Sequence, residues 1–227
     1  MPAHCPPSSS PERSLRSKEN PIAHIPDGVL SAPVLITGAL LSTAAVAWGV
    51  RKLDYDRIPQ AAVLAAAFFV SSLLSVPIGP SSVHLLLNGL MGLVLGWSAL
   101  PTIAVALLMQ AIFFGYGGLL VLGNNILNVG LPALACALLL GPWLRHAKGK
   151  QGFLIGALAG AGGVVMTGAF LCTSLALSGP DFVPAARVIL ITYLPLMAVE
   201  AAITGFAVAF ILRVSPELIL TPRPHHE

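Results

Sequence analysis

Long apolar stretches separated by short polar connections make up most of the sequence. Seven of them begin at or after Leu30, and each is close to the roughly 20 residues that a helix needs to cross the hydrocarbon of a bilayer. They cover residues 30–50, 60–77, 83–99, 100–116, 126–144, 152–178 and 186–213. The third and fourth meet at Leu100–Pro101 with almost no connection, which predicts a tight helical hairpin. The whole pattern predicts an all-α, polytopic transmembrane bundle of about seven helices.

The composition agrees with a membrane protein. Hydrophobic residues make up 56% of the 227 residues and charged residues 9%, whereas a soluble domain carries about 25% charged residues. A transmembrane β-barrel would show alternating segments of about ten residues, but the apolar stretches here are continuous. No basic cluster is large enough to indicate nucleic-acid binding. The three cysteines are widely spaced, which argues against a disulfide framework and a structural zinc site.

Three regions are expected along the chain. Residues 1–22 are polar and rich in Pro and Ser, so we expect either a disordered tail or a start codon assigned too far upstream. Residues 23–214 form the expected single transmembrane domain. Residues 215–227 are expected to be a short cytoplasmic tail.

Basic residues are distributed unevenly around the predicted helices. The first, fifth and seventh stretches end on the same side of the bundle, and eight basic residues follow them: Arg51, Lys52, Arg57, Arg145, Lys148, Lys150, Arg213 and Arg223. The positive-inside rule makes this side cytoplasmic. We therefore expect the first helix to begin outside and the C-terminus to lie inside. Arg13, Arg16 and Lys18 of the tail would then lie outside, against the rule, which is a second reason to doubt that the tail belongs to the mature protein.

Three polar segments fall together on the predicted outer side. They are residues 23–28, 78–84 and 115–125, with Asn128 one turn further on. Glycine-rich backbone at membrane depth is tolerated only where it packs against protein or lines a cavity, so these segments predict a small polar pocket. Of the six histidines, only His24 and His84 lie in this layer. Two imidazoles near carboxamides suit a late first-row divalent metal, but each histidine could equally be a cap or interface residue.

An ordered series of motifs resembles the CbiM/NikM family. The motifs are His24-Ile25-Pro26-Asp27-Gly28, Gly79-Pro80-Ser81-Ser82-Val83-His84-Leu85 with Asn88-Gly89, Gln110-Ala111-Ile112-Phe113-Phe114-Gly115-Tyr116-Gly117-Gly118, and Leu122-Gly123-Asn124-Asn125 with Asn128. The resemblance covers about residues 23–214. Members of this family are the substrate-binding membrane subunits of cobalt and nickel energy-coupling-factor transporters, which belong to the ABC transporters.

The resemblance implies a non-enzymatic transport subunit in the bacterial plasma (inner) membrane, with no catalytic residues and no organic cofactor. Its substrate would be Ni(II) or Co(II). Its partners would be a coupling transmembrane subunit and a pair of ATP-binding subunits, with or without a small accessory membrane subunit. The chain has no GxxxxGK[ST] phosphate-binding loop, so it cannot supply the ATP hydrolysis itself.

The resemblance also implies a set of metal ligands. These are the free α-amine of Ala23, the amide nitrogen and imidazole of His24, and the imidazole of His84, in a near-square-planar arrangement that suits Ni(II) or Cu(II). As written, 22 residues precede Ala23, so its nitrogen is an amide. We hypothesise that translation starts at position 22 with a non-standard codon read here as Ile22, and that removal of the initiator Met exposes Ala23. If residues 1–22 are retained, another donor such as His4 or Cys5 would be needed.

Several other polar residues are candidates for supporting roles. Glu200 is the only clear charge inside a predicted span, and such residues are costly and usually functional; it could fix helix packing against Gln110 or Asn88, or take part in coupling. Asn88 lies one helical turn after His84 and could orient its imidazole or bind a neighbouring helix. Gln110 could line the pocket, and Asn124, Asn125 and Asn128 could line it or satisfy the backbone of a turn. Asp27 is expected to be a turn residue.

Two other functions are alternatives to metal capture. A self-sufficient, proton-coupled transporter could use Glu200 as its proton carrier, but neither several intramembrane carboxylates nor inverted repeats are evident. A membrane-embedded metalloprotease would need a helical HExxH motif, which the sequence lacks.

Overall fold

A computed structural model describes residues 25, 27–73, 76–78 and 81–220. Residues 1–22, Ala23 and His24 therefore lie outside the described residues, as does most of the expected C-terminal tail.

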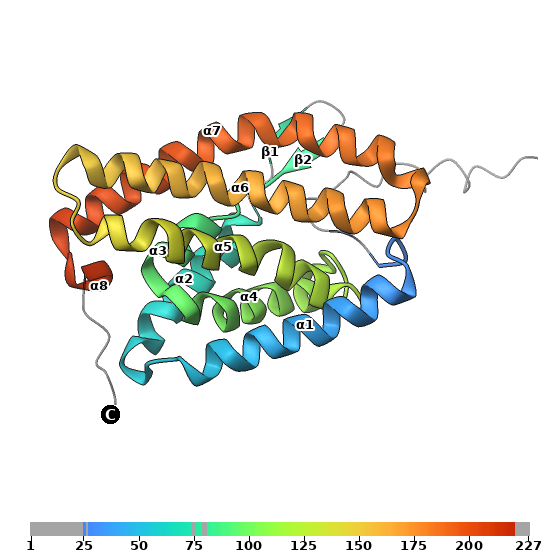
Figure 1. Ribbon diagram of the computed structural model, residues 1–227, viewed down its shortest axis with the longest axis horizontal. Helices are drawn as coiled ribbons and strands as arrows, with labels where there is room; N and C mark the ends of the chain where they lie inside the picture. The colour runs from blue at the N-terminus through green and yellow to red at the C-terminus, as the bar shows by residue number, and fades with distance from the viewer. Residues whose placement is uncertain (1–24, 26, 74–75, 79–80, 221–227) are drawn as a thin grey trace, which may run out of the picture.

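The long helices lie roughly side by side along the long axis of the molecule (Figure 1). In chain order the helices are α1 (Ala32–Arg51), α2 (Ile58–Ser71), α3 (Asn88–Leu95), α4 (Ala99–Phe114), α5 (Leu122–Leu144), α6 (Lys150–Ser178), α7 (Val183–Val214) and α8 (Glu217–Leu220), with 3₁₀ turns η3 (Tyr55–Arg57), η4 (Gly96–Ser98) and η5 (Pro180–Phe182).

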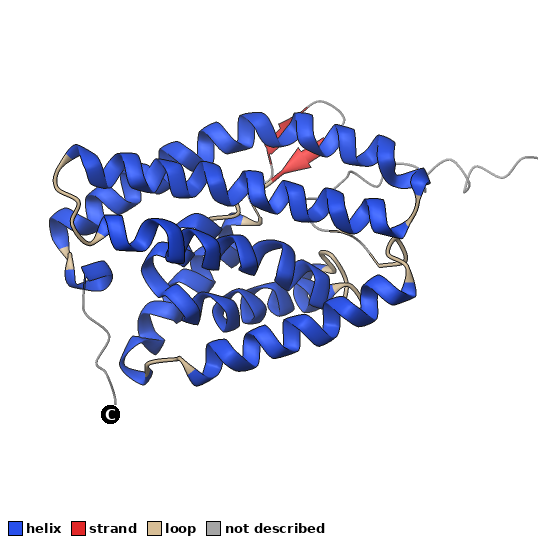
Figure 2. Cartoon of the chain, in the orientation of Figure 1, coloured by secondary structure: helices blue, strands red, loops and turns tan. Residues whose placement is uncertain are grey.

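The all-α prediction is confirmed, with one small exception. Two three-residue strands, β1 (Val76–Ile78) and β2 (Ser81–Val83), pair antiparallel at the edge of the helical bundle (Figure 2). Five stretches of the described chain are long and apolar enough to cross a membrane: α1, Asn88–Phe114, α5, α6 and Val188–Val214 of α7. The fold is that of a multi-pass membrane protein.

The second predicted helix, 60–77, is too long. Helix α2 ends at Ser71, and the chain continues through β1 instead. Pro77 explains why the helix does not extend to residue 77, because a proline disfavours helical backbone in the residue before it and lacks a backbone hydrogen-bond donor. At 14 residues, α2 rises only about 21 Å, less than a full bilayer crossing.

The third predicted helix, 83–99, is shorter than expected, and its turn is misplaced. Residues 84–87 are not helical, since Leu87 has a left-handed φ of +48° and α3 begins only at Asn88. Gly96, with φ +59°, ends α3, so the turn to α4 lies at Gly96–Ser98 rather than at Leu100–Pro101. Pro101 instead occupies the first turn of α4, where a proline costs no helical hydrogen bond.

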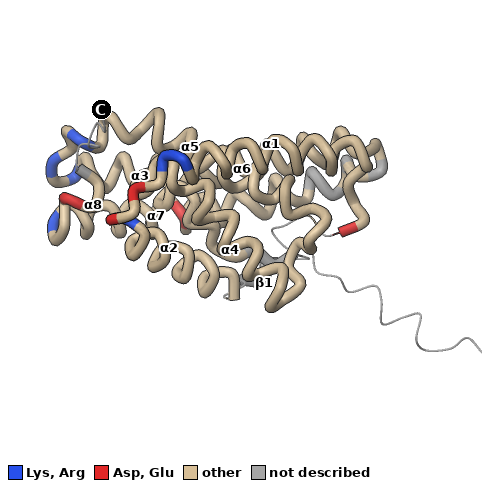
Figure 3. The backbone as a smooth tube through the Cα atoms, turned by 90° about the horizontal axis from the view of Figure 1, so that it is seen from below, with Lys and Arg blue, Asp and Glu red and all other residues tan. Residues whose placement is uncertain are grey.

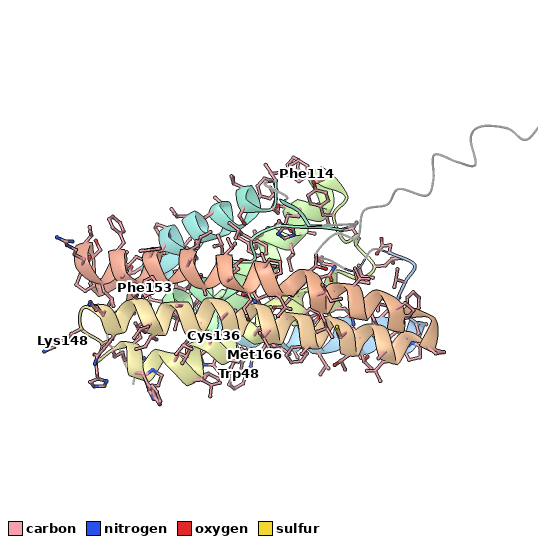
Figure 4. The ribbon with its side chains drawn as sticks, turned by 90° about the horizontal axis from the view of Figure 1, so that it is seen from above. Trp48, Phe114, Cys136, Lys148, Phe153 and Met166 are labelled. Atoms are coloured by element: carbon pink, nitrogen blue, oxygen red, sulfur yellow. The ribbon has the colours of Figure 1, made fainter. Side chains whose placement is uncertain are left out.

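The predicted clustering of positive charge is observed. Lys and Arg residues of the described chain gather at the end of the bundle that holds the α1–α2 and α5–α6 connections and the end of α7 (Figure 3). Figure 4 shows Lys148 at this end, whereas Cys136 lies among the helices. Trp48 and Trp143 lie near the same end with half or more of their surface exposed, and the Lys52 ammonium is 5.9 Å from the Trp48 ring. Aromatic and basic side chains together are typical of a membrane–water interface.

Small residues allow the helices to approach closely. A Cβ at Gly92 of α3 would overlap the Ala133 backbone of α5, and one at Gly160 of α6 would overlap the Glu200 backbone of α7. A Cβ at Gly156 would lie 2.8 Å from the Thr204 carbonyl oxygen. These three glycines therefore serve packing within the bundle, as small residues commonly do between membrane helices.

Candidate metal centre

The first described residue, Ile25, is held by a carboxamide from α5. Its backbone nitrogen donates to Asn125 Oδ1 at 3.3 Å, and its carbonyl oxygen accepts from Asn125 Nδ2, also at 3.3 Å. Both residues are buried. Asn125 is placed for this contact because it lies in the first turn of α5, where the chain leaves the glycine-rich connection. The backbone directly after His24 is thus fixed to the bundle.

A second contact anchors the same segment two residues later. Asp27 Oδ1 accepts hydrogen bonds from the backbone nitrogens of Leu120 and Val121, both at 3.1 Å. The loop can wrap around this carboxylate because Gly118 has a φ of +90° and no side chain; a Cβ there would overlap the Asp27 carboxyl group. Asp27 lies in a turn, as expected, and its carboxyl group also binds the backbone of a distant segment, which the sequence did not predict.

His84 lies directly after β2 and is 3% exposed. Its Nδ1 is 3.0 Å from the Leu85 carbonyl oxygen. Since a carbonyl oxygen can only accept, Nδ1 carries the hydrogen, and the lone pair of the neutral ring is on Nε2. Burial lowers the pKa of His84, and the bond to Leu85 offsets this only in part. The histidine therefore favours the neutral form that can bind a metal.

One buried apolar cluster joins the two segments that carry the predicted histidines. Ile25 and Leu30, from the segment after His24, belong to the same cluster as Leu86, two residues after His84. Val121 and side chains of α6 and α7 complete the cluster: Val164, Leu171, Tyr193 and Leu196. The tertiary structure therefore brings the chain on both sides of the predicted site into one packed region.

Asn88 does not share a helical face with His84, because residues 84–87 are not helical. Its side chain instead joins three helices. Asn88 Nδ2 donates to Thr167 Oγ1 of α6 at 2.8 Å, and it is 3.4 Å from the carbonyl oxygens of Val129 in α5 and Gly163 in α6. These contacts match the helix-binding alternative for Asn88.

The remaining carboxamides contribute buried polar atoms. Asn124 Nδ2 donates to the Val34 carbonyl oxygen of α1 at 3.3 Å, and Asn128 Oδ1 is 3.4 Å from Ser174 Oγ of α6. Within the described part of the chain, Asn124 Oδ1, Asn128 Nδ2 and both side-chain amide atoms of Gln110 have no hydrogen-bond partner. Burying such groups without a partner is expensive.

Glu200 makes a contact that the sequence did not predict. Its Oε1 accepts hydrogen bonds from the backbone nitrogens of Leu86 and Leu87, at 2.9 Å for Leu87. The carboxyl group thus binds the loop that carries His84, whereas packing against Gln110 or Asn88 was one of the two alternatives that the sequence left open. No group of three His, Cys, Asp or Glu side chains in the described residues is arranged to hold a metal ion.

Comparison with solved structures defines the class of protein. A crystal structure described as that of a transition metal transporter superposes with a TM-score of 0.70 at 25% sequence identity, covering 87% of this chain and 96% of that one. A second, truncated transition metal transporter gives the same TM-score at 24% identity, with 84% of this chain and 98% of that one covered. The fold is therefore that of a membrane transporter for transition metals.

The CbiM family, described as "cobalt uptake substrate-specific transmembrane region", matches residues 24–218, and the chain belongs to this family. A putative metal transport protein of Haemophilus influenzae is 37% identical over 198 residues, covering 86% of this chain and 96% of the relative. A putative cobalt transport protein, CbiM 2 of Methanosarcina barkeri, is 29% identical, with 87% and 92% covered. The fused nickel transport protein NikMN of Rhodobacter capsulatus is 40% identical over 144 residues, which are 59% of this chain but 39% of that longer relative. The protein is thus a membrane component of cobalt or nickel uptake.

Proposed function

We propose that this protein is the substrate-binding subunit of an energy-coupling-factor transporter in the bacterial plasma membrane. It captures Ni(II) or Co(II) on the outer side and releases the ion inward. A coupling transmembrane subunit and a pair of ATP-binding subunits, with or without a small accessory membrane subunit, drive the cycle. The observation that carries the proposal is the packing of the chain after His24 and the chain after His84 into one buried cluster, with the Asn125 carboxamide bound to the backbone of Ile25.

The proposed ligands are the α-amine of Ala23, the amide nitrogen and imidazole of His24, and the imidazole of His84. The Asn125 contact supports this set because it restrains the backbone one residue after His24. The bond from His84 Nδ1 to Leu85 supports it because it leaves the neutral ring with its lone pair on Nε2. Four nitrogen donors in a plane suit Ni(II). The set requires a mature chain that begins at Ala23.

Dependence on partner chains is supported by the fused relatives. Two of them, from Rhodobacter capsulatus and Lactiplantibacillus plantarum, are named as fused nickel transport proteins, and the matched regions span only 39% and 44% of their lengths. Their further sequence is consistent with a transport component that works together with other subunits.

Calorimetric titration of Ni(II) and Co(II) into detergent-purified protein tests the metal site. We expect tight one-to-one binding by the chain that begins at Ala23 and much weaker binding by the full-length chain. His84→Ala should abolish tight binding, while His146→Ala, at the exposed end of α5, should retain it. Equal binding by both chain lengths would remove the α-amine from the ligand set, and the absence of binding by either would refute metal capture.

A transport assay separates the proposed coupling from the proton-coupled alternative. The assay uses proteoliposomes that contain the partner subunits. We expect nickel uptake to require ATP on the side of the membrane where the ATP-binding subunits lie. Uptake by this chain alone, driven by a proton gradient without ATP, would instead establish a self-sufficient secondary transporter.

A further inference from the structure

A hydrogen-bonded chain connects the buried carboxylate of Glu200 with the ring of His84. Glu200 Oε1 accepts from the Leu86 backbone nitrogen, and the Leu85 carbonyl oxygen lies 3.0 Å from His84 Nδ1. The Leu85 carbonyl and the Leu86 N–H belong to the same peptide unit, which is planar and rigid. The carboxylate and the imidazole therefore hold opposite edges of one peptide plane.

We propose that Glu200 is a positioning residue for the metal site, which fixes the orientation and tautomer of His84 through the peptide between Leu85 and Leu86. The proposal rests on His84 being a metal ligand, as proposed above. When one ring nitrogen of a histidine binds a metal, the hydrogen bond of the second ring nitrogen fixes the orientation of the ring and the direction of the metal-binding lone pair. A residue that holds the acceptor of this hydrogen bond in place contributes to the same effect. Hydrogen bonds in such a chain also polarise one another inside a protein.

Two backbone amides of the loop before α3, those of Leu86 and Leu87, have Glu200 Oε1 as their acceptor. Residues 84–87 lie between β2 and α3, and Leu87, at the N-cap position of α3, has a left-handed φ of +48°. The apolar Leu87 side chain supplies no helix cap, and Asn88 Oδ1 accepts from the Gly89 backbone nitrogen in the first turn of α3 instead, at 2.9 Å. The second hydrogen bond of Glu200, from the Leu87 backbone nitrogen to Oε1 at 2.9 Å, places a side-chain acceptor directly before the start of α3.

Close helix packing brings Glu200 within reach of the loop. On one side of α6, the absence of a side chain at Gly160 lets the Glu200 backbone approach. On the adjacent stretch of α6, the Ala159 backbone lies against Gly89, the second residue of α3. Helices α7 and α3 therefore meet α6 at neighbouring residues, and Glu200, fully buried, spans the remaining distance to the loop before α3.

Two substitutions at Glu200 separate positioning from proton transfer. Glu200→Gln retains a carbonyl oxygen that can accept from both amides but cannot act as a proton carrier. Glu200→Leu has a similar volume and no acceptor. Thr204→Val is the matched control, because Thr204 lies one turn further along α7 and is equally buried.

The experiment measures Ni(II) affinity by calorimetry and the visible absorption bands of the bound Ni(II), which report ligand geometry. It uses the chain length that binds metal in the titration above. Glu200→Leu is expected to lose roughly tenfold to a hundredfold in affinity, the usual effect of removing a group that orients a metal ligand, and to shift the absorption bands. Glu200→Gln and Thr204→Val are expected to keep the wild-type bands and an affinity within about threefold of the wild type.

Wild-type affinity and bands in Glu200→Leu would overturn the proposal. So would an equal loss in Glu200→Gln, which would assign the role to the charge or its proton, or an equal loss in Thr204→Val, which would reduce the role to helix packing. If Glu200→Leu does not yield a monodisperse protein, Glu200→Asp withdraws the carboxylate from the amides by one carbon–carbon bond and is judged by the same criteria. Failure of the wild type to bind metal would refute the proposed function instead.

Discussion

The Asn125 carboxamide and the backbone of Ile25 form a reciprocal pair of hydrogen bonds, each 3.3 Å long, across 100 positions of sequence. The pair uses the donor and the acceptor of the amide at once, as a neighbouring β-strand would. It fixes the position and the direction of the chain immediately after His24. An asparagine in the middle of the sequence, at the start of α5, therefore holds a segment near the N-terminus.

Replacing this carboxamide should weaken metal binding. Asn125→Leu keeps the approximate volume but removes both hydrogen bonds, each worth about 1 kcal/mol net and more when its buried partner is left unsatisfied. We expect Ni(II) affinity to fall by roughly tenfold to a hundredfold in calorimetric titration. Ser42→Ala is the control, because the buried Ser42 hydroxyl donates to the Ala39 carbonyl oxygen of its own helix, one turn earlier. Unchanged affinity in Asn125→Leu would show that this pair is dispensable for the site.

The loop around Asp27 offers a pair of glycines that differ in one respect. Gly115 and Gly118 both have left-handed φ angles, +68° and +90°, so alanine at either position costs about 1–2 kcal/mol. A Cβ at Gly118 would also overlap the Asp27 carboxyl group, whereas a Cβ at Gly115 would meet no described atom within 4 Å. We expect Gly118→Ala to lower the melting temperature and the Ni(II) affinity more than Gly115→Ala does. Equal effects would mean that overlap with Asp27 adds nothing to the free-energy cost of placing alanine at a left-handed φ.

Helix α6 offers a similar comparison for the packing under Glu200. Gly160→Ala places a methyl group against the Glu200 backbone, and such overpacking costs about 1–3 kcal/mol. Gly162→Ala, two residues away, meets open space among the described residues and should gain up to about 1 kcal/mol in helix propensity. We expect thermal unfolding in detergent to occur at a lower temperature for Gly160→Ala and at an unchanged or higher temperature for Gly162→Ala. A normal melting temperature for Gly160→Ala would show that α6 and α7 can separate without cost.

The orientation in the membrane can be tested with single cysteines. In a background with the three native cysteines replaced by serine, Lys148→Cys lies at the basic end and Leu120→Cys in the loop that binds Asp27. We expect a membrane-impermeant maleimide added to intact cells to label Leu120→Cys, and to label Lys148→Cys only after the membrane is opened. The reverse pattern would invert the proposed topology and place the predicted metal site on the cytoplasmic side.

The sequence predicted the membrane-embedded, all-α fold correctly because this prediction depends on local hydropathy. Stretches 152–178 and 186–213 differ from α6 and α7 by only a few residues at their ends. The clustering of basic residues at one end was also predicted correctly, because the side on which each connection lies depends on the order of the membrane-crossing stretches along the chain. The prediction failed between Ser71 and Asn88, where an apolar segment forms a strand pair and a non-helical loop. Hydropathy alone does not distinguish a buried loop from a buried helix.

The sequence by itself also determined which residues were candidates, since His84, Asn125 and Glu200 are rare polar groups in apolar surroundings. Only the tertiary structure decided their partners. Glu200 meets Leu86 across 114 positions and Asn125 meets Ile25 across 100, and both contacts depend on how α5, α6 and α7 pack. Side-chain partners in a helical bundle are set by the distances between helices, which here depend on small residues such as Gly160. The hydrophobic pattern along one helix predicts which face is buried, but it does not predict which backbone amide will lie next to a carboxylate.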